Sequence, residues 1–305
     1  MMMETEKQPK VSVCVVTYNQ ENYIQQCLQS IVDQKVSFDF EVIVSDDCST
    51  DDTRSIIKNF KKTYPDLVKV IFQTENIGGL KNYLAVHRSA KGEYVSHVDG
   101  DDWLCPGKLE KQVLYLDANE TCALVAHRMQ IWRSEEKTGT TKENAQSITL
   151  SNLLRGHPMF MNSSIMYRRS LLGEIFHLNK SFIDFYVYVA AALRADIGFI
   201  NEVLGNYRSS IGISSRLNLM PYIEDAIDLA SSKVGETRDV ARCRARQHLS
   251  YATTALCSND LNLFRTHLSS SIRADRFWMT SRFISFGRFF PKSLKYFLLA
   301  YKKRA

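Results

Sequence analysis

The chain has 305 residues, of which 45% are hydrophobic and 24% charged, a composition typical of a soluble globular protein with one or two domains. The net charge of +6 is uneven, because residues 272–305 hold nine lysines and arginines and one acidic residue. The remainder is slightly acidic, and no nucleic-acid motif accompanies the basic tail, so we expect no nucleic-acid partner.

The cysteines and the N-terminus bear on the cellular compartment. The seven cysteines are widely spread and form no C-x-x-C pair, which argues against a zinc site or a thioredoxin-type pair. Free thiols favour a reducing compartment. Residues 1–10 lack the apolar core of a signal peptide, and no run is long enough to span a bilayer. We expect a cytoplasmic protein, peripheral at most on the inner face of the cytoplasmic membrane.

The first hundred residues alternate buried strands with amphipathic helices. Helical spacing of apolar residues follows the first strand, at Ile24, Leu28 and Ile31, and Ser49 with Asp52 resembles a capping box before a second helix. A third helix is expected over residues 80–90. Short apolar, β-branched runs predict four strands, at residues 11–16, 40–45, 68–72 and 94–98. This alternation predicts an α/β fold, with a mostly parallel sheet covered by helices on both faces.

The periodicity is less regular after residue 120. A polar loop is expected over residues 135–144, and a helix over residues 184–195. From Pro221 onward the chain reads as helical, which predicts a C-terminal helical extension. Further strands are expected at residues 123–132, 163–167 and 197–201.

Polar side chains cluster after three of the first four strands. Ligands of parallel α/β sheets bind at the carboxyl ends of the strands, which meet along one edge. We therefore expect a single site at this edge. Its members are Thr17, Tyr18 and Asn19 after the first strand, Asp46 and Asp47 after the second, and Asp99, Asp101 and Asp102 after the fourth.

The acidic stretch at residues 99–102 is the most informative of these clusters. Carboxylates this close repel one another, and a hard divalent cation with oxygen ligands would justify them. Asp99 and Asp101 point the same way in an extended chain and so can share one ion. Because Asp and Gly are also ordinary turn residues, the stretch alone leaves a simple turn equally open.

Taken together, the three strand ends suit a nucleoside diphosphate. Tyr18 can stack on a base, Asp47 can accept a hydrogen bond from a base N–H, and Asp99 with its neighbour Asp101 can hold a metal and the ribose. The sequence contains neither a P-loop nor a G-x-G-x-x-G fingerprint. A metal held by carboxylates is another way to neutralise the diphosphate.

Four segments in register resemble a family 2 glycosyltransferase with the GT-A fold. They are Val-Ser-Val-Cys-Val-Val-Thr-Tyr-Asn (residues 11–19), Glu-Val-Ile-Val-Ser-Asp-Asp-Cys-Ser-Thr-Asp-Asp-Thr (41–53), Asn-Ile-Gly-Gly (76–79) and Gly-Glu-Tyr-Val-Ser-His-Val-Asp-Gly-Asp-Asp-Trp (92–103). The resemblance covers roughly residues 10–215. Cys48 stands where the family's Asp-Asp-Gly-Ser pattern has glycine.

This resemblance implies an inverting, metal-dependent transfer of a sugar from a nucleotide sugar, usually UDP-linked, to an acceptor hydroxyl. The metal would be Mn²⁺ or Mg²⁺, with Asp101 as principal ligand and Asp99 near the ribose and metal. By motif match the nucleotide sugar would contact Thr17, Tyr18, Asn19, Asp47, Lys81 and Asp99.

The second half carries a fainter resemblance, in residues 163–170, 184–193 and 197–208. It makes Asp184 the candidate general base that takes the proton from the attacking hydroxyl. Two positions depart from the family pattern. Ile183 precedes the base where many relatives have Glu or Gly, and Ser210 stands where many have histidine. From its position before a helical run, Asp184 also reads as a simple N-cap.

We divide the chain into a polar tail (residues 1–10), a GT-A domain (11–215) and a helical basic region (216–305). The domain has a nucleotide-sugar-binding half (11–120) and an acceptor half (121–215). In the basic region, Phe283, Phe286 and Phe290 would share one helical face beside lysines and arginines. That pattern fits both an interfacial helix on an anionic membrane, suited to a lipid-linked saccharide acceptor, and a helix packed on the domain.

The leading hypothesis is therefore a glycosyltransferase of cell-surface polysaccharide synthesis, such as O-antigen or capsule. A nucleotidyl- or phosphotransferase, or a non-catalytic nucleotide-sugar-binding protein, are the alternatives. Several residues also have plain structural interpretations. Lys81 alone is typical of a solvated helix lysine, His97 of a core histidine with a partner, and Asp102 of a support for the neighbouring loop.

Overall fold

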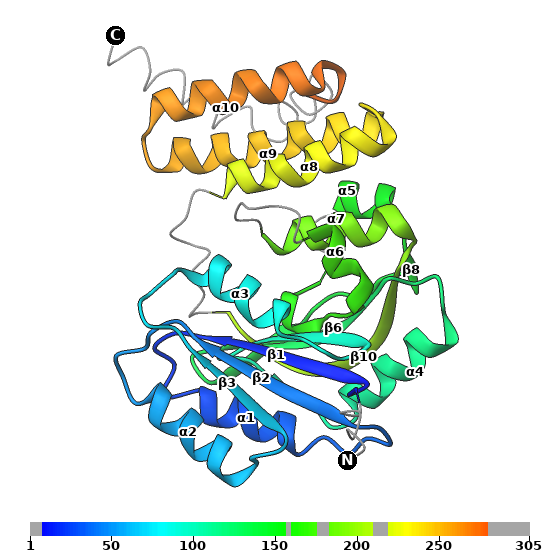
Figure 1. Cartoon of the computed structure of the whole chain (residues 1–305). Helices are drawn as coiled ribbons and strands as arrows, with labels where there is room; N and C mark the ends of the chain where they lie inside the picture. The colour runs from blue at the N-terminus through cyan, green and yellow to red at the C-terminus, as the bar shows by residue number, and fades with distance from the viewer. Residues whose placement is uncertain (1–7, 157–159, 176–182, 210–218, 280–305) are drawn as a thin grey trace. The chain divides into compact units, whose positions relative to one another are not determined.

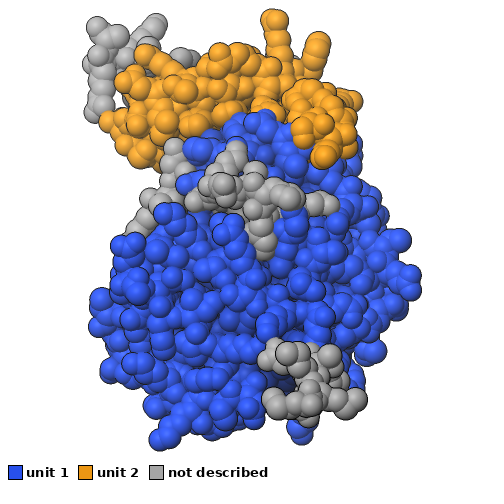
Figure 2. All heavy atoms as spheres, viewed as in Figure 1, with its two compact units in different colours: residues 1–229 blue, residues 230–305 orange. Residues whose placement is uncertain are grey.

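The computed structural model describes residues 8–156, 160–175, 183–209 and 219–279 (Figure 1). The chain divides into two compact units, residues 1–229 and residues 230–305 (Figure 2). The first unit contains a ten-stranded sheet and the second is helical within its described residues.

The first four long strands form the parallel part of the sheet. They are adjacent in the order β3-β2-β1-β4, so the chain starts in the middle and adds strands on both sides. The apolar residues of the three inner strands are mostly buried, as expected for strands that are covered on both faces, whereas those of the outer strand β3 are mostly half-buried. Their bounds are β1 (Val11–Thr17), β2 (Phe40–Asp46), β3 (Val68–Phe72) and β4 (Tyr94–Asp99).

Helices cover both faces of these strands, and α1 and α2 lie on the opposite face from α3 (Figure 1). Val13 and Val15 pack in one core cluster with Ile24 and Leu28 of the first helix. The Cys14 side chain points to the opposite face of the sheet and approaches the backbone carbonyl of Val86 in the third helix. The helices are α1 (Ile24–Val32), α2 (Thr53–Thr63) and α3 (Gly79–Arg88). The predicted α/β fold is confirmed.

The rest of the sheet mixes strand directions. Beyond β4 the order is β9-β6-β10-β5, in which β6 and β10 are parallel and the other neighbouring pairs are antiparallel. Two further strands pair at the sides, β7 with β6 and β8 with β10. The bounds are β5 (Trp103–Leu104), β6 (Leu124–Arg133), β7 (Glu136–Thr140), β8 (Ser147–Ile148), β9 (Met166–Arg168) and β10 (Ile197–Arg208).

Sequence periodicity erred in three places in this half. The expected polar loop at residues 135–144 contains β7. All five residues of this edge strand are exposed, so it lacks the apolar residues by which a strand is recognised in a sequence. The strand expected at residues 163–167 begins as the 3₁₀ helix η1 (Asn162–Ser164). The strand expected at residues 197–201 is too short, since β10 continues to Arg208. Register shifts between Ile200 and Gly205 interrupt the alternation of buried and exposed side chains, so periodicity did not reveal the second part of the strand.

The expected capping box at the start of α2 is also wrong. The N-cap is Asp52, whose side chain makes no capping hydrogen bond, and the first N–H of the helix, that of Thr53, donates to Asp51 at 3.0 Å. The Ser49 hydroxyl and backbone N–H instead donate to the carboxylate of Asp46. Ser49 therefore holds the loop after β2 rather than the helix that follows it.

The remaining helices lie in the second half of the chain. They are α4 (Lys108–Ala118), α5 (Leu150–Gly156), the 3₁₀ helix η2 (Arg169–Leu171), α6 (Leu172–Ile175), α7 (Asp184–Arg194), α8 (Met220–Val234), α9 (Arg238–Cys257) and α10 (Leu261–Ala274). Thr237 and Asp260 cap α9 and α10. The expected helical extension is confirmed within the described residues, whereas residues 283–290 lie outside them. In the parts of the chain that the structure describes, no helix has both the length and the apolar character to cross a bilayer.

Lys108, at the start of α4, is fully buried, and its ammonium donates a hydrogen bond to Ser96 at 2.7 Å. Burial lowers the pKa of Lys108 from 10.5 to about 7. Because the unfolded lysine binds a proton that the folded one lacks, stability should rise with pH between about 7 and 10. Lys108→Met is expected to raise the free energy of unfolding at pH 7 by on the order of 2 kcal/mol.

Urea unfolding at pH 7 and pH 9 tests this expectation, with Lys111→Met as the control. Lys111 lies on the same helix, and its exposed ammonium pairs with Glu202. The Lys108 variant should show a smaller rise in stability between the two pH values than the control. An unchanged rise would contradict the assignment of Lys108 as the titrating group.

Candidate functional site

The carboxyl ends of β1, β2 and β4 are level with one another. Thr17 of β1 pairs with Asp46 of β2, and Val16 pairs with Asp99 of β4. The polar residues that follow the three strands therefore share one edge of the sheet, as the sequence predicted. This edge is the candidate site.

The loop after β1 exposes Tyr18 and Asn19 and buries Thr17. Tyr18 is 39% exposed and is open to a stacking partner. The buried Thr17 donates from its hydroxyl to Gln20. Asn19 has a φ of +51° and accepts a hydrogen bond from the Thr50 N–H at 2.8 Å. Thr17 and Asn19 thus hold the loop in place, while Tyr18 has the exposed ring that base stacking requires.

The loop after β2 is built around two buried carboxylates. Asp46 pairs with Arg54, and Asp47 accepts a hydrogen bond from the Ile77 N–H at 2.8 Å. Asp47 therefore ties this loop to the segment that leads into α3. Cys48 has a φ of +62°, the left-handed region that glycine adopts without strain. Cys48 thus has the backbone conformation that glycine favours, at the position where the family pattern has glycine.

Lys81 lies in the first turn of α3 and is exposed. Its helix begins directly after the segment held by Asp47. Its proposed contact with the nucleotide stays a prediction.

Asp99 ends β4 with its carboxylate partly exposed. Oδ1 lies 3.1 Å from Nε2 of His97, and Oδ2 accepts a hydrogen bond from the Ser163 hydroxyl at 3.3 Å. Burial acts to raise the pKa of Asp99, but the interactions with His97 and Ser163 outweigh it and lower the pKa. Asp99 is therefore held as a carboxylate, and His97 is the partnered core histidine that the sequence suggested.

The pKa values of Asp101 and Asp102 are shifted in the opposite direction from that of Asp99. Burial and the charge of Asp99 raise the pKa of Asp101 to about 6. Burial and both neighbouring charges raise the pKa of Asp102 well above its ordinary value. Asp102 Oδ1 accepts a hydrogen bond from the Arg208 N–H, and its buried Oδ2 has no hydrogen-bond partner among the described residues. The loop thus concentrates negative charge that a cation would neutralise.

Asp99 and Asp101 suit a divalent ion of the Mg²⁺ or Mn²⁺ type. Such ions take oxygen ligands and are often held by one or two carboxylates plus substrate phosphates and water. Within the described residues, no three His, Cys, Asp or Glu side chains surround a common point as a closed metal site. The donor set fits an ion that is shared with a diphosphate rather than one enclosed by protein.

Arg208, at the end of β10, was given no role from the sequence. Its guanidinium lies 4.3 Å from the ring centre of Trp103 and 4.7 Å from that of Tyr23, and it donates to the Asp101 carbonyl. It also donates to Gln26 at 2.7 Å. This buried cation fixes the backbone of the acidic loop. The sequence signal that could have pointed to Arg208 is the Tyr-Arg pair at residues 207–208, which belongs to the fainter family resemblance.

Tyr207 faces the same carboxylates. Burial, followed by the charges of Asp102, Asp99 and Asp101, raises its pKa to about 12, and Asp184 adds to the effect. Its hydroxyl therefore stays protonated and available as a hydrogen-bond donor at neutral pH.

Asp184 is the first residue of α7, and the N-cap is Ile183, so the capping alternative is wrong. Its two carboxylate oxygens accept hydrogen bonds from the Phe185 N–H at 2.8 Å and the Tyr188 hydroxyl at 3.1 Å. Burial and the charge of Asp99 raise the pKa of Asp184. The structure thus brings Asp184 into the electrostatic range of the strand-end cluster. Ser210, the other departure from the family pattern, lies outside the described residues.

Gly100 separates Asp99 from Asp101 at a point of close approach. An added Cβ would lie 3.0 Å from the Thr17 side chain and would collide with the Gln20 amide, which hydrogen-bonds to Asp101. Gly100→Ala is expected to weaken Mn²⁺ affinity about tenfold, measured by calorimetric titration. Gly173→Ala is the control, because a Cβ there meets no atom within 4 Å. Equal affinities in both variants would contradict the expectation.

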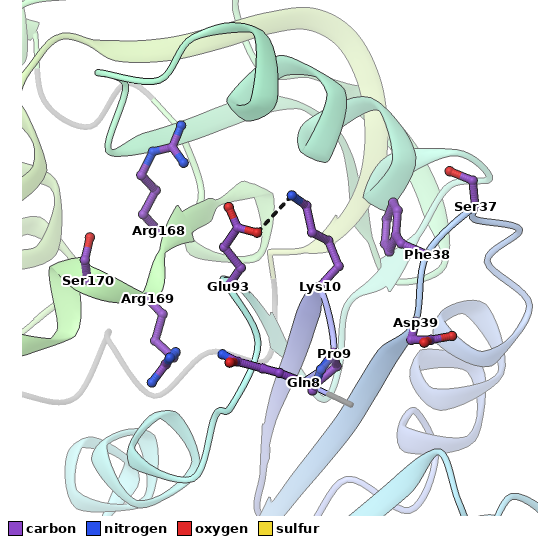
Figure 3. Close-up of a pocket in the computed structure, with 10 residues that line it drawn as sticks. All are labelled: Gln8, Pro9, Lys10, Ser37, Phe38, Asp39, Glu93, Arg168, Arg169 and Ser170. Atoms are coloured by element: carbon purple, nitrogen blue, oxygen red, sulfur yellow. Dashed lines mark hydrogen bonds and ion pairs between the residues drawn. The ribbon is translucent and has the colours of Figure 1, made fainter. Parts of the chain in front are cut away.

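A cavity of about 780 Å³ lies at the other end of the strands (Figure 3). Its wall includes Lys10, which precedes β1, and Arg168 at the end of β9. Lys10 is paired with Glu93 at 2.9 Å and with Asp117 at 3.0 Å. No residue of the strand-end cluster lines this cavity.

Comparison with known proteins gives independent information. The chain is 33% identical over 201 residues to the uncharacterized protein Rv1520 of Mycobacterium tuberculosis, a match covering 65% of this chain and 58% of the relative. It is 32% identical over 144 residues to the poly(ribitol-phosphate) beta-N-acetylglucosaminyltransferase TarS of Staphylococcus aureus, covering 47% of this chain and 25% of TarS. The chain thus spans less than two thirds of the length of these relatives.

Solved structures share the fold. Residues 1–349 of TarS in complex with UDP-GlcNAc superpose with a TM-score of 0.66 at 23% identity, covering 87% of this chain and 81% of that one. The mannosyltransferase PcManGT of Pyrobaculum calidifontis, in complex with GDP-Man and Mn²⁺, gives a TM-score of 0.51 at 18% identity, covering 88% and 86% of the two chains.

A family description matches the part of the chain that builds the site. Residues 12–176, more than half of the chain, match the family described as glycosyl transferase family 2. The matched range includes β1, β2 and β4 with the three polar clusters that follow them. The chain belongs to glycosyl transferase family 2.

Proposed function

We propose that this protein transfers a sugar from a nucleoside diphosphate sugar to an acceptor hydroxyl, with inversion at the anomeric carbon. The observation that carries the proposal is the joint placement of Tyr18, the Asp99–Asp101 pair and Asp184 around one edge of the sheet. The exposed ring suits a base, the carboxylate pair suits a metal-bound diphosphate, and Asp184 suits an acceptor proton.

Inversion requires one displacement, in which the acceptor oxygen attacks the anomeric carbon as the diphosphate leaves. Asp184 would take the acceptor proton as the new bond forms, and its raised pKa makes it a stronger base than an ordinary aspartate. Tyr188 and the Phe185 N–H hold its carboxylate in one orientation. No side chain has to form a covalent bond to the sugar.

A divalent ion would be held by Asp101 and Asp99. When bound, such an ion supplies positive charge for the leaving diphosphate. Arg208 and the Gly100 backbone keep the two carboxylates in a fixed loop. Burial, and after it the charge of Asp99, raises the pKa of Asp101, and a bound cation would relieve both effects, which supports the assignment.

For the donor we propose a UDP sugar. TarS, a relative by sequence and by fold, has been crystallised with UDP-GlcNAc, and the more distant PcManGT with GDP-Man. For the pathway we propose cell-surface polysaccharide synthesis, since relatives include the TuaG glycosyltransferase of teichuronic acid biosynthesis in Bacillus subtilis.

The test is a panel of UDP-, GDP- and TDP-sugars with a mixture of saccharide acceptors, each with Mn²⁺ and with EDTA. We expect release of UDP, a new glycoside detected by mass spectrometry, and loss of both with EDTA. The NMR coupling of the anomeric proton then reports inversion. Release of a sugar phosphate would favour the phosphotransferase alternative, and binding without turnover would favour the non-catalytic one.

The membrane proposal rests on the sequence of the basic C-terminal region, part of which, residues 280–305, lies outside the described residues. The nine lysines and arginines of residues 272–305, with interleaved aromatic residues, suit the inner face of an anionic membrane. Co-flotation with vesicles of anionic lipid, and its absence with neutral vesicles, is the expected result. Removal of residues 280–305 should abolish it.

A further inference from the structure

A buried chain of hydrogen-bonding side chains starts at Asp99 and runs away from the site. Nε2 of His97 lies 3.1 Å from Asp99 Oδ1, and Nδ1 of His97 lies 3.0 Å from Nε2 of His87. Nδ1 of His87 in turn contacts the hydroxyl of Tyr167. The three side chains beyond Asp99 come from β4, α3 and β9, and each has no exposed surface.

The chemistry of the groups fixes the direction of donation at the site. Because the Asp99 carboxylate can only accept, Nε2 of His97 must carry the hydrogen. The Tyr167 hydroxyl can then donate to His87, and His87 to His97, so that all bonds point toward Asp99. Hydrogen bonds that point the same way polarise and strengthen one another. Burial lowers the pKa of His87, which keeps His87 neutral as this pattern requires.

Packing holds the imidazoles in place. The Tyr83 ring stacks on His87 with 3.8 Å between ring centres and lies 4.8 Å from His97. Leaving a buried polar group unsatisfied costs about 1–3 kcal/mol, so aliphatic residues would be the simpler filling for this space. The sequence instead places two imidazoles directly behind a carboxylate of the site.

We propose that His97 is a positioning residue, which with His87 and Tyr167 behind it holds the Asp99 carboxylate in one orientation for the nucleotide sugar. This inference rests on the proposed role of Asp99 in donor binding. The chain engages Oδ1, and Ser163 engages Oδ2, so both oxygens are fixed. Each oxygen keeps a lone pair for a ribose hydroxyl or an ion.

The kinetic test compares His97→Phe with His97→Gln. Phenylalanine fills the space without a donor, whereas the glutamine amide can reach the position of Nε2. We expect kcat/KM for the nucleotide sugar to fall about 10- to 100-fold in His97→Phe and to recover largely in His97→Gln. His127→Phe is the control, since His127 is equally buried, on β6, and its Nδ1 faces the Arg128 carbonyl. Equal activity of His97→Phe and the control would overturn the proposal.

A double-mutant cycle separates positioning from general damage to the fold. The dissociation constant of UDP with Mn²⁺ is measured by calorimetry for His97→Phe, Asp99→Asn and the double variant. If His97 acts through Asp99, its substitution should change the constant less than twofold once Asp99 is asparagine. Independent, multiplicative losses would overturn the proposal.

A spectroscopic measurement keeps this inference separate from the proposed function. In ¹⁵N-histidine-labelled protein, Asp99→Asn should shift the Nε2 signal of His97 and leave the His127 signals in place. This readout does not need turnover, so a protein without transferase activity can still show the bond. An unchanged His97 signal would overturn the positioning role even in a fully active transferase.

Discussion

Asp101→Asn should lower metal-dependent release of UDP by about 100- to 1000-fold and at the same time stabilise the metal-free fold. The loss of activity follows from removing the principal proposed metal ligand. The gain in stability follows from the charge, because burial and Asp99 raise the pKa of Asp101 from 3.8 to about 6. Ionisation at neutral pH therefore opposes folding when no cation is present.

The raised pKa of Asp101 also determines how the stability of the metal-free protein depends on pH. The folded state binds the Asp101 proton more tightly than the unfolded state, so stability falls as the pH rises from about 4 through 6. At pH 7.5 the asparagine variant should be more stable by on the order of 2 kcal/mol, measured by urea unfolding in EDTA. At pH 4 the difference should nearly vanish. A less stable variant at pH 7.5, or one that retains full activity, would contradict the role of Asp101.

Asp66→Asn is the matched control for both measurements. Asp66 is exposed and lies between α2 and β3, away from the acidic loop. It should change neither UDP release nor the pH dependence of stability. Addition of Mn²⁺ should stabilise the wild type and the control, and should stabilise the Asp101 variant much less.

The half of the fold that carries the strand-end cluster was predictable because local signals agree there. β1, β2 and β4 are apolar runs buried on both faces, β3 is a partly buried apolar run, and the helices between them have clear apolar faces. Such strands are recognised without any long-range information. Their parallel arrangement then places the polar residues at their carboxyl ends along one edge, which is where they lie.

The rest of the sheet was less predictable because its strands are irregular and its pairings are distant in sequence. β10 shifts register at Val203, and β5 has two residues whose partners lie about one hundred positions later. A periodicity argument has no access to either feature. For the same reason the sequence assigned no role to Arg208, whose guanidinium reaches the Asp101 carbonyl only through this pairing.

Single residues inside recognised motifs were also hard to interpret. His97 reads as an apolar-strand histidine, and its contact with His87 depends on how α3 packs against β4. Asn19 and Asp47 read as ligand contacts, yet both hold neighbouring loops through backbone N–H groups. Motif position identifies such residues, whereas the partners of their side chains follow only from the tertiary structure.

Asp184→Asn is expected to lower kcat for sugar transfer by about 100- to 10,000-fold while leaving UDP affinity and the donor KM nearly unchanged. The amide cannot accept the acceptor proton. Its oxygen can still accept a hydrogen bond from the Phe185 N–H, and its NH2 group can donate to the oxygen of Tyr188. Asp184 acts in this proposal on the acceptor, not on the nucleotide. Single-turnover transfer with calorimetric UDP binding separates the two effects, and sugar transfer at the wild-type rate would eliminate the base assignment.

Tyr188→Phe removes a hydrogen-bond donor to Asp184 and leaves the carboxylate itself in place. The Tyr188 hydroxyl donates to Asp184 at 3.1 Å and lowers the carboxyl pKa, against the larger effect of burial that raises it. Loss of this donor should raise the pKa of Asp184 further and move the acidic limb of the kcat profile to higher pH. At a pH above that limb, transfer should continue, because the carboxylate itself remains. If the pH profile shifts in Tyr188→Phe and the rate falls in Asp184→Asn, both results identify Asp184 as the base. If the acidic limb does not shift in Tyr188→Phe, that limb belongs to another group.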